Sequence, residues 1–190
     1  MKELSLHILD IVQNSIRADA SLVIINIFED LAADTLSIEI LDDGRGMDKE
    51  TLKKVQDPFF TTRTTRKVGL GIPLFAQLAR DCGGEFTIKS DINKGTVVNA
   101  LFIRSHIDMP PLGSMVDTIV SLVAVNPDID FLYHHRLDKK DFVLDTREIK
   151  KRLGDVPISH PMVLDWIKSF IKEGLTEING GVDNVNDKIH

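Results

Sequence analysis

Four polar residues near the amino terminus recur at the spacing of one helix face. His7, Asp10, Asn14 and Arg17 follow one another at steps of three and four residues, and most positions between them are apolar. An acid, an amide and a guanidinium are costly to bury on such a helix unless something pairs with them. An anionic ligand bridged by a metal ion would pair with all three. The alternative is a solvated stripe on an ordinary amphipathic helix.

A second polar cluster follows an alternating run at residues 35–40, which predicts a half-buried strand. Asp42 comes next, and Gly44 and Gly46 stand at every second place after it, as in a sharp loop that a ligand can approach. The carboxylate can accept a hydrogen bond from an exocyclic amine. The alternative is a plain turn, because Asp-Gly is a common hairpin signal.

Residues 57–72 combine two aromatic residues, a cationic stretch and a glycine pair. Arg63 and Lys67 supply positive charge, and Gly69 and Gly71 stand where a new helix is expected to begin. Backbone amides at the start of a helix favour phosphate oxygens. The segment is therefore predicted to bind phosphate.

Taken in order, these motifs resemble the four boxes of the GHKL ATPase superfamily, which includes gyrase-type topoisomerases, Hsp90, MutL and the sensor histidine kinases. The boxes are Asn14, Asp42-x-Gly-x-Gly, Gly69-x-Gly and Gly95-Thr. The stretch Pro58-Phe-Phe-Thr-Thr-Arg is most similar to the catalytic domain of a sensor histidine kinase. The resemblance covers a little over half of the chain.

The resemblance implies a role for each matching residue. Asn14 would ligate Mg²⁺ between the phosphates of ATP, and Arg17 would lie near them. Asp42 would recognise the adenine amino group, and Thr96 would support the adenine pocket. Asp10 stands where ATP-hydrolysing members and the anti-sigma serine kinases place a glutamate general base, so it is the candidate catalytic residue. The predicted ATP contacts are Asn14, Arg17, Asp42, Gly44, Gly46, Met47, Arg63, Lys67, Gly69, Leu70, Gly71, Ile72 and Thr96.

The hydrophobic pattern predicts the elements that would position these groups. Helices and strands should together form a two-layer α/β sandwich with a mixed sheet, which agrees with the Bergerat fold that the resemblance implies. Asp48 is a candidate N-cap for a short helix. The expected helices cover about 2–18, a few residues after Met47, and a stretch from about Gly71, and the expected strands lie near 22–28, 35–41, 85–90 and 96–103.

Residues 106–190 predict a small α+β carboxy-terminal module, partner-docking or regulatory, after an ATP-binding domain at 1–105. Adjacent His134 and His135 on a strand would face opposite sides, so they are poorly placed to chelate one ion. The apolar stripe of the last helix is interpreted as core or as a partner-docking face. The expected elements are a helix at 115–125, a hairpin around 131–144, a helix capped by Thr146 through Leu153, and a helix from Pro161 ending at Gly174.

Composition argues against several classes of protein. One cysteine provides no disulfide framework, and a net charge of −6 argues against nucleic acid as the main partner. No run approaches the roughly 18 apolar residues of a membrane span. We therefore expect a cytoplasmic protein that has neither nucleic acid nor a membrane as its partner.

The expected function is regulation that depends on Mg-ATP. Because the ATP domain begins within the first few residues, the sequence predicts a freestanding histidine-kinase-like or anti-sigma-kinase-like signalling protein, a transferase that phosphorylates a separate partner. Two alternatives stay open. One is a non-catalytic ATP-dependent binding switch, in which residues 57–68 close over the nucleotide. The other is a slow GHKL-type ATPase that works as a dimer.

Overall fold

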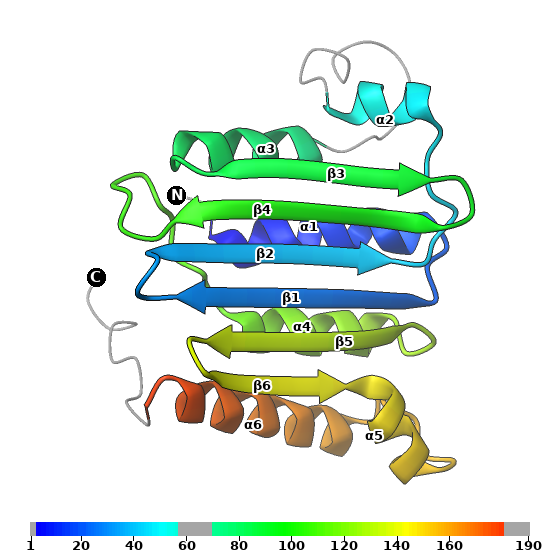
Figure 1. Cartoon of the computed structure of the whole chain (residues 1–190). Helices are drawn as coiled ribbons and strands as arrows, with labels where there is room; N and C mark the ends of the chain where they lie inside the picture. Colours follow the sequence, from blue (N-terminus) through cyan, green and yellow to red (C-terminus); the bar gives the residue numbers. More distant parts are fainter. Residues whose placement is uncertain (1–2, 57–69, 181–190) are drawn as a thin grey trace.

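Six strands form one mixed sheet in the residues that the structure describes, which are 3–56 and 70–180 of a computed structural model. The strands are β1 (Leu22–Asp30), β2 (Thr35–Asp42), β3 (Glu85–Asp91), β4 (Gly95–Ile103), β5 (Asp130–Leu137) and β6 (Lys140–Asp145). Their order is β3-β4-β2-β1-β5-β6 (Figure 1). Only β1 and β5 pair in parallel; the other neighbours are antiparallel. The predicted mixed sheet is confirmed.

Helices form the second layer of the fold. In Figure 1 the helices α1, α3 and α4 lie behind the sheet, and α6 lies along its β6 edge. The bounds of the helices are α1 (Leu4–Arg17), α2 (Lys49–Gln56), α3 (Gly71–Asp81), α4 (Met115–Val125), α5 (Thr146–Leu153) and α6 (Pro161–Ile178). The predicted two-layer α/β architecture is therefore confirmed, with helices on one face of the sheet.

The core lies between the two layers and follows from the residue pattern. Alternate residues of β1, such as Ile25 and Ile27, are fully buried, and Ile38 continues the same face in β2. The apolar side of α1, including Ile8 and Val12, is buried in the same cluster. Burying each of these side chains contributes about 1.5–3 kcal/mol. Asp10 and Arg17 of the predicted polar face stay exposed, whereas His7 is buried.

Side-chain caps begin four of the described helices, α2, α4, α5 and α6, and two of them bear on the predicted caps. Asp48 accepts a hydrogen bond from the N–H of Thr51 at 2.7 Å, which confirms it as the cap of α2. At α5 the predicted cap is wrong, because Asp145 caps the helix instead of Thr146. The hydroxyl of Thr146 is buried and accepts a hydrogen bond from the N–H of Phe131 at 2.8 Å, so it is already engaged by β5.

The predicted end of the last helix at Gly174 is also wrong, because α6 continues to Ile178. A Cβ at Gly174 would lie 2.0 Å from a ring carbon of Phe142 in β6. The glycine therefore allows the helix to approach the sheet closely. Its role is packing, and it does not mark a helix terminus.

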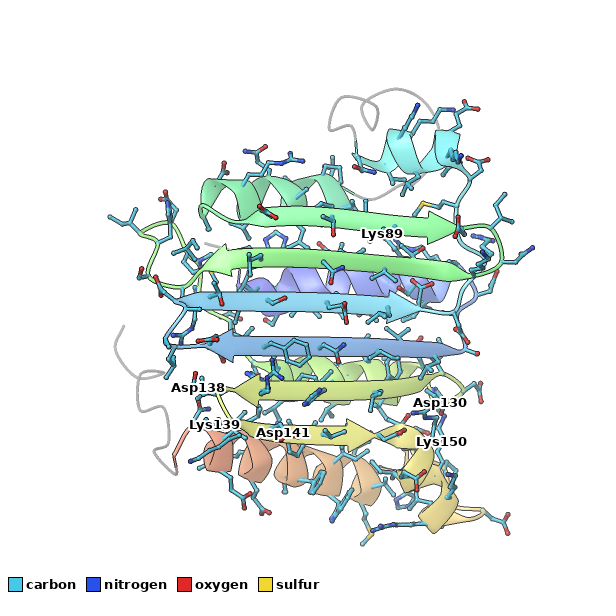
Figure 2. All side chains as sticks on the ribbon, viewed as in Figure 1. Lys89, Asp130, Asp138, Lys139, Asp141 and Lys150 are labelled. Atoms are coloured by element: carbon cyan, nitrogen blue, oxygen red, sulfur yellow. The ribbon has the colours of Figure 1, made fainter. Side chains whose placement is uncertain are left out.

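The carboxy-terminal segment continues the same sheet as the amino-terminal one, since β5 lies parallel to β1. Lys150 of α5 reaches back to Asp130 at the start of β5, with a nitrogen–oxygen distance of 2.7 Å (Figure 2). The two segments thus share one core. The division of the chain at residue 105 into an ATP-binding and a docking or regulatory unit stays a prediction about their roles.

Buried polar side chains cross the junction of β1 and β5. The hydroxyl of Tyr133 lies 2.8 Å from Nδ1 of His135, and Nε2 of His135 lies 2.9 Å from Oε1 of Glu29. Arg104 completes the network at 3.0 Å from Oε2 of Glu29. His134 lies on the other face, against the ring of Phe28, as two adjacent strand residues must. No sequence pattern had indicated this network.

We expect Glu29→Gln to lower the free energy of unfolding by about 2 kcal/mol at neutral pH. Burial raises the pKa of Glu29, but hydrogen bonds and charge from His135 and Arg104 outweigh burial, so the net pKa lies below its usual range. Such a carboxylate contributes stability above its unfolded-state pKa of about 4.3, and that stability is lost as the pH falls through the lowered pKa.

The measurement is urea unfolding of both proteins between pH 7 and pH 3, with Glu85→Gln on exposed β3 as the matched control. The gap between wild type and Glu29→Gln should narrow as the pH falls below about 4. A gap that stays constant with pH would contradict a stabilising charge at Glu29.

Candidate functional site

A cleft of about 560 Å³ lies between α1, the loop after β2 and the start of β4. Its volume is in the range of small-molecule sites, about 300–1,000 Å³. It is lined by apolar side chains such as Ile40 and Val98 and by several polar groups. The predicted contacts among its lining residues are Asn14, Arg17, Asp42, Gly46, Met47, Ile72 and Thr96.

The carboxylate of Asp42 is held in one orientation by three hydrogen bonds. Its Oδ1 accepts from the N–H of Gly44 at 2.9 Å and from the N–H of Thr96 at 3.2 Å. Its Oδ2 accepts from the hydroxyl of Ser15 at 2.6 Å. A carboxylate has about four acceptor positions, so one remains for a donor in the cleft. The prediction from sequence did not include Ser15, although its place beside Asn14 on α1 was a usable signal.

The loop after Asp42 is wedged between two other backbone segments. Gly46 has φ +65°, and a Cβ there would lie 1.9 Å from the carbonyl oxygen of Asp91. A Cβ at Gly44 would lie 2.8 Å from the carbonyl oxygen of Ala18 at the end of α1. The glycines were predicted to admit a ligand to the backbone. In the structure they admit the neighbouring backbone itself, which fixes the wall of the cleft.

Ser90 at the end of β3 connects the two loops that form this wall of the cleft. Its hydroxyl accepts from the N–H of Met47 at 2.8 Å and donates to the carbonyl of Gly95 at 2.9 Å. It also lies 3.0 Å from the hydroxyl of Thr96. The sequence carried no signal for this role, because a serine near a strand end is common. The loop after β2 and the turn between β3 and β4 are thus bound to each other.

The polar face of α1 only partly enters the cleft. Asn14 and Arg17 line it and contact each other, with Oδ1 of Asn14 accepting from Arg17 at 3.4 Å. Asp10 is exposed and does not line it; a Cβ at Gly71 would lie 3.1 Å from the Cβ of Asp10. His7 is buried and stacks on Phe75 with ring centroids 5.7 Å apart. The sequence predicted that the four polar residues of α1 share one face. In the structure, His7 is not part of the cleft.

The start of α3 is placed beside this face, whereas the segment before it is not described. Leu70 precedes α3 and is half-exposed, and Gly71 is buried beside Asp10. Neither of them lines the cleft, and nor does Gly44. The predicted phosphate contacts Arg63, Lys67 and Gly69 lie outside the described residues, as does the segment 57–68.

The polar side chains that line the cleft suit the binding of ATP together with a hard cation such as Mg²⁺. No cluster of three or more metal-ligating side chains of His, Cys, Asp or Glu occurs in residues 3–56 and 70–180. Mg²⁺ usually takes only one or two protein ligands and completes its shell with phosphate oxygens and waters. The carboxamide oxygen of Asn14 would be such a protein ligand, and the neighbouring guanidinium of Arg17 would bind a phosphate oxygen.

No helix within the described part of the chain is both long and apolar enough to cross a bilayer.

Comparison with known proteins agrees with this geometry. Residues 2–106 match the family described as histidine kinase-, DNA gyrase B-, and HSP90-like ATPase. Sporulation kinase C of Bacillus subtilis is 32% identical over 89 residues, covering 47% of this chain and 21% of that protein. Sporulation kinase E of the same organism is 34% identical over 88 residues, covering 45% and 11%. The chain thus spans about a fifth or less of the length of these relatives.

A solved structure extends the likeness to the whole fold. The MutL ATPase domain of Aquifex aeolicus, complexed with ADP, covers 95% of this chain and 70% of that chain at 14% identity and a TM-score of 0.53. At that identity the likeness concerns the fold alone. The family match, in contrast, covers more than half of the sequence and includes the loops that build the cleft. The chain therefore belongs to the histidine kinase-, DNA gyrase B- and HSP90-like ATPase family, with an ATPase domain similar to those of histidine kinases.

Proposed function

We propose that this chain is a Mg-ATP-binding regulatory protein that phosphorylates a separate protein partner. The observation that carries the proposal is the carboxylate of Asp42, which three donors hold at the wall of a cleft that Asn14 and Arg17 also line. Its remaining acceptor position would receive the amino group of adenine. The apolar side chains of Ile40 and Val98 would contact the purine ring.

The phosphates would extend from the cleft along the polar face of α1. Asn14 would supply a carboxamide oxygen to Mg²⁺, and Arg17 would bind a phosphate oxygen. Catalysis of phosphoryl transfer is mostly positioning and charge stabilisation, which a metal ion and a guanidinium provide. Asn14 and Arg17 are the described residues best placed for that work.

Asp10 is the proposed general base for the hydroxyl or imidazole of the partner. It is exposed on the same side of α1 and lies against the start of α3. A base must come within about 2.6–3.2 Å of the atom that it deprotonates. Asp is one methylene shorter than the Glu of related enzymes, so the partner would have to approach α1 closely.

A non-catalytic binding switch is the second candidate, and the position of Asp10 favours it. Asp10 is not among the residues that line the cleft. Bound ATP would then change the surface of the protein, and a partner would bind or dissociate without transfer. Such a switch requires only that ATP bind the two conformations with different affinities.

Incubation with γ-labelled ATP and a cell extract separates these functions. Label on a partner protein supports the kinase, whereas ATP binding without transfer or hydrolysis supports the switch. Phosphate release whose specific rate rises with protein concentration supports a dimeric ATPase. Failure to bind ATP at all would overturn the proposal.

We expect Asn14→Ala to abolish the Mg²⁺ dependence of ATP binding, because it removes the proposed protein ligand of the cation. Calorimetric titration with ATP in Mg²⁺ and in EDTA should then give the same affinity within about twofold. Gln13→Ala, next to it on α1 but not in the lining of the cleft, is the matched control and should keep the dependence. Persistent Mg²⁺ dependence in Asn14→Ala would place the cation elsewhere.

A further inference from the structure

One side of α6 exposes three large apolar residues in a row. Met162, Trp166 and Phe170 are 76%, 52% and 37% exposed, while Ile167 and Ile171, which lie about 100° and 140° around the helix from Trp166, are fully buried. The three recur at four-residue steps, so they lie on one face of the helix. Single apolar residues on a surface are ordinary, but a contiguous apolar row marks an interaction site.

The aromatic part of this row is held rigidly by the sheet. The rings of Trp166 and Phe170 are stacked, with centroids 5.1 Å apart and 8° between their planes. The ring of Phe170 also contacts that of Phe142 in β6, at 5.2 Å between centroids. Because these rings are already ordered, a partner would lose little side-chain entropy in binding them.

Two acidic residues continue the apolar row toward the carboxy-terminal end of α6. At about 100° per residue, Glu173 and Glu177 point within about 20° of the direction of Trp166. Both are exposed, and neither belongs to an ion pair among the described side chains. Of the nearby cations, Lys168 pairs with Asp117 at 3.2 Å. Lys172 points about 120° away from the row.

We propose that this α6 face, which consists of Met162, Trp166, Phe170, Glu173 and Glu177, docks a segment of a protein partner. That segment is an amphipathic helix whose apolar side chains are followed by lysine or arginine. The inference rests on the proposed function, because it names the kind of partner that function requires. In Figure 1, α6 lies at the β6 edge of the sheet, far from α2 and α3, so a docked partner leaves the nucleotide cleft free.

Charge complementarity favours this occupant over a second copy of the chain. Two α6 helices in parallel would place glutamate against glutamate. An antiparallel pair centred on Trp166 would carry Glu173 and Glu177 past Pro161, the first residue of the partner's α6, so the two acids would meet no lysine or arginine of that helix. An anionic lipid surface would be repelled by the same two acids.

The test uses the full chain and two designed helical peptides without tryptophan. Both carry the same leucine row, and the two positions that follow it are lysine in one peptide and glutamate in the other. Trp166 is the only tryptophan of the chain, so its emission reports whether the α6 face is covered. The lysine peptide should shift this emission to the blue and bind at least about tenfold more tightly at low salt, a preference that shrinks in 1 M salt.

A charge reversal makes the test reciprocal. The double variant Glu173→Lys, Glu177→Lys should prefer the glutamate peptide, while Glu85→Lys on distant β3 should behave like the wild type. Equal binding of both peptides, binding of neither, or a stronger blue shift with anionic than with neutral vesicles would overturn the inference. Calorimetry with ATP on the same samples separates the two claims: normal ATP binding with failed docking rejects the docking face alone, and absent ATP binding rejects the proposed function.

Discussion

Asp42→Asn is expected to weaken ATP binding by at least about a hundredfold and to leave the fold intact. The substitution keeps the shape of the side chain but turns one acceptor oxygen into an NH₂ donor. The N–H groups of Gly44 and Thr96 both point at Oδ1, so the amide must keep its oxygen there. The new NH₂ group then takes the place of Oδ2, where it would face the amino group of the proposed adenine, itself a donor. The proposed charge-assisted hydrogen bond would be replaced by a repulsive contact.

The fold should survive because the hydroxyl of Ser15, which donates to Oδ2 at 2.6 Å, can turn and accept instead. Isothermal titration calorimetry measures the affinity, and thermal unfolding verifies the fold. Asp43→Asn is the matched control: its carboxylate binds the N–H groups of Ser21 and Leu22 and is not part of the cleft. That variant should keep the affinity within about twofold. Unchanged affinity in Asp42→Asn would count against the assignment of the adenine pocket.

Most of the secondary structure could be predicted because its apolar periodicities are regular. The helix expected at about 2–18 is α1 (Leu4–Arg17), and the helix expected at 115–125 is α4 with those bounds. The strands agree within two residues at their ends. The predicted helix ends were less accurate where the residue taken as the end has a packing role instead. In a sequence, a glycine that admits an aromatic ring, such as Gly174 beneath Phe142, cannot be told from one that ends a helix.

Contacts between distant segments could not be predicted, because nothing local encodes them. Glu29 meets His135 across 106 residues, and this contact depends on the parallel pairing of β1 with β5. The hydroxyl of Ser90 reaches Met47 across 43 residues. Each requires the assembled sheet. The resemblance to the family nevertheless predicted that Asp42 and Thr96 share one pocket. The order of the family's motifs reflects the arrangement of the whole fold, so no local signal was needed.

The helical spacing of the four polar residues indicated which side of α1 they share. It did not indicate how far each of them lies from the cleft along the helix axis. His7 and Asn14 share a side of α1 approximately, yet seven residues at about 1.5 Å each separate them by about 10 Å. Asn14 therefore lines the cleft, whereas His7 stacks on Phe75 in the core. A stripe of polar residues thus predicts a functional face, and only the fold determines how far along it a ligand extends.

Gly95→Ala is expected to lower the free energy of unfolding by about 3 kcal/mol and to weaken ATP binding in the protein that remains folded. Gly95 has φ +89°, and a Cβ there would lie 1.8 Å from the carbonyl oxygen of Asp42. That oxygen belongs to the backbone, so it can move aside only if β4 separates from β2. The separation would occur where Asp42 and Thr96 are paired, and it would pull the N–H of Thr96 away from the carboxylate.

Gly83→Ala separates the steric clash from the cost of the backbone conformation. Gly83 follows α3 and also has a positive φ, +71°, but the heavy atom nearest to a Cβ built there is 3.4 Å away, an ordinary van der Waals contact. The N–H of Gly83 donates to the carbonyl of Arg80 and that of Gly84 to the carbonyl of Ala79, as in a helix that ends on a left-handed residue. Gly83→Ala should therefore lose only about 1 kcal/mol, the usual penalty of alanine in the left-handed region. At about 2–4 °C per kcal/mol for a chain of this size, thermal unfolding should show a loss in Tm about three times as large for Gly95→Ala. Equal losses in the two variants would mean that the junction of β2 and β4 is looser than the structure shows, and that Asp42 does not depend on it.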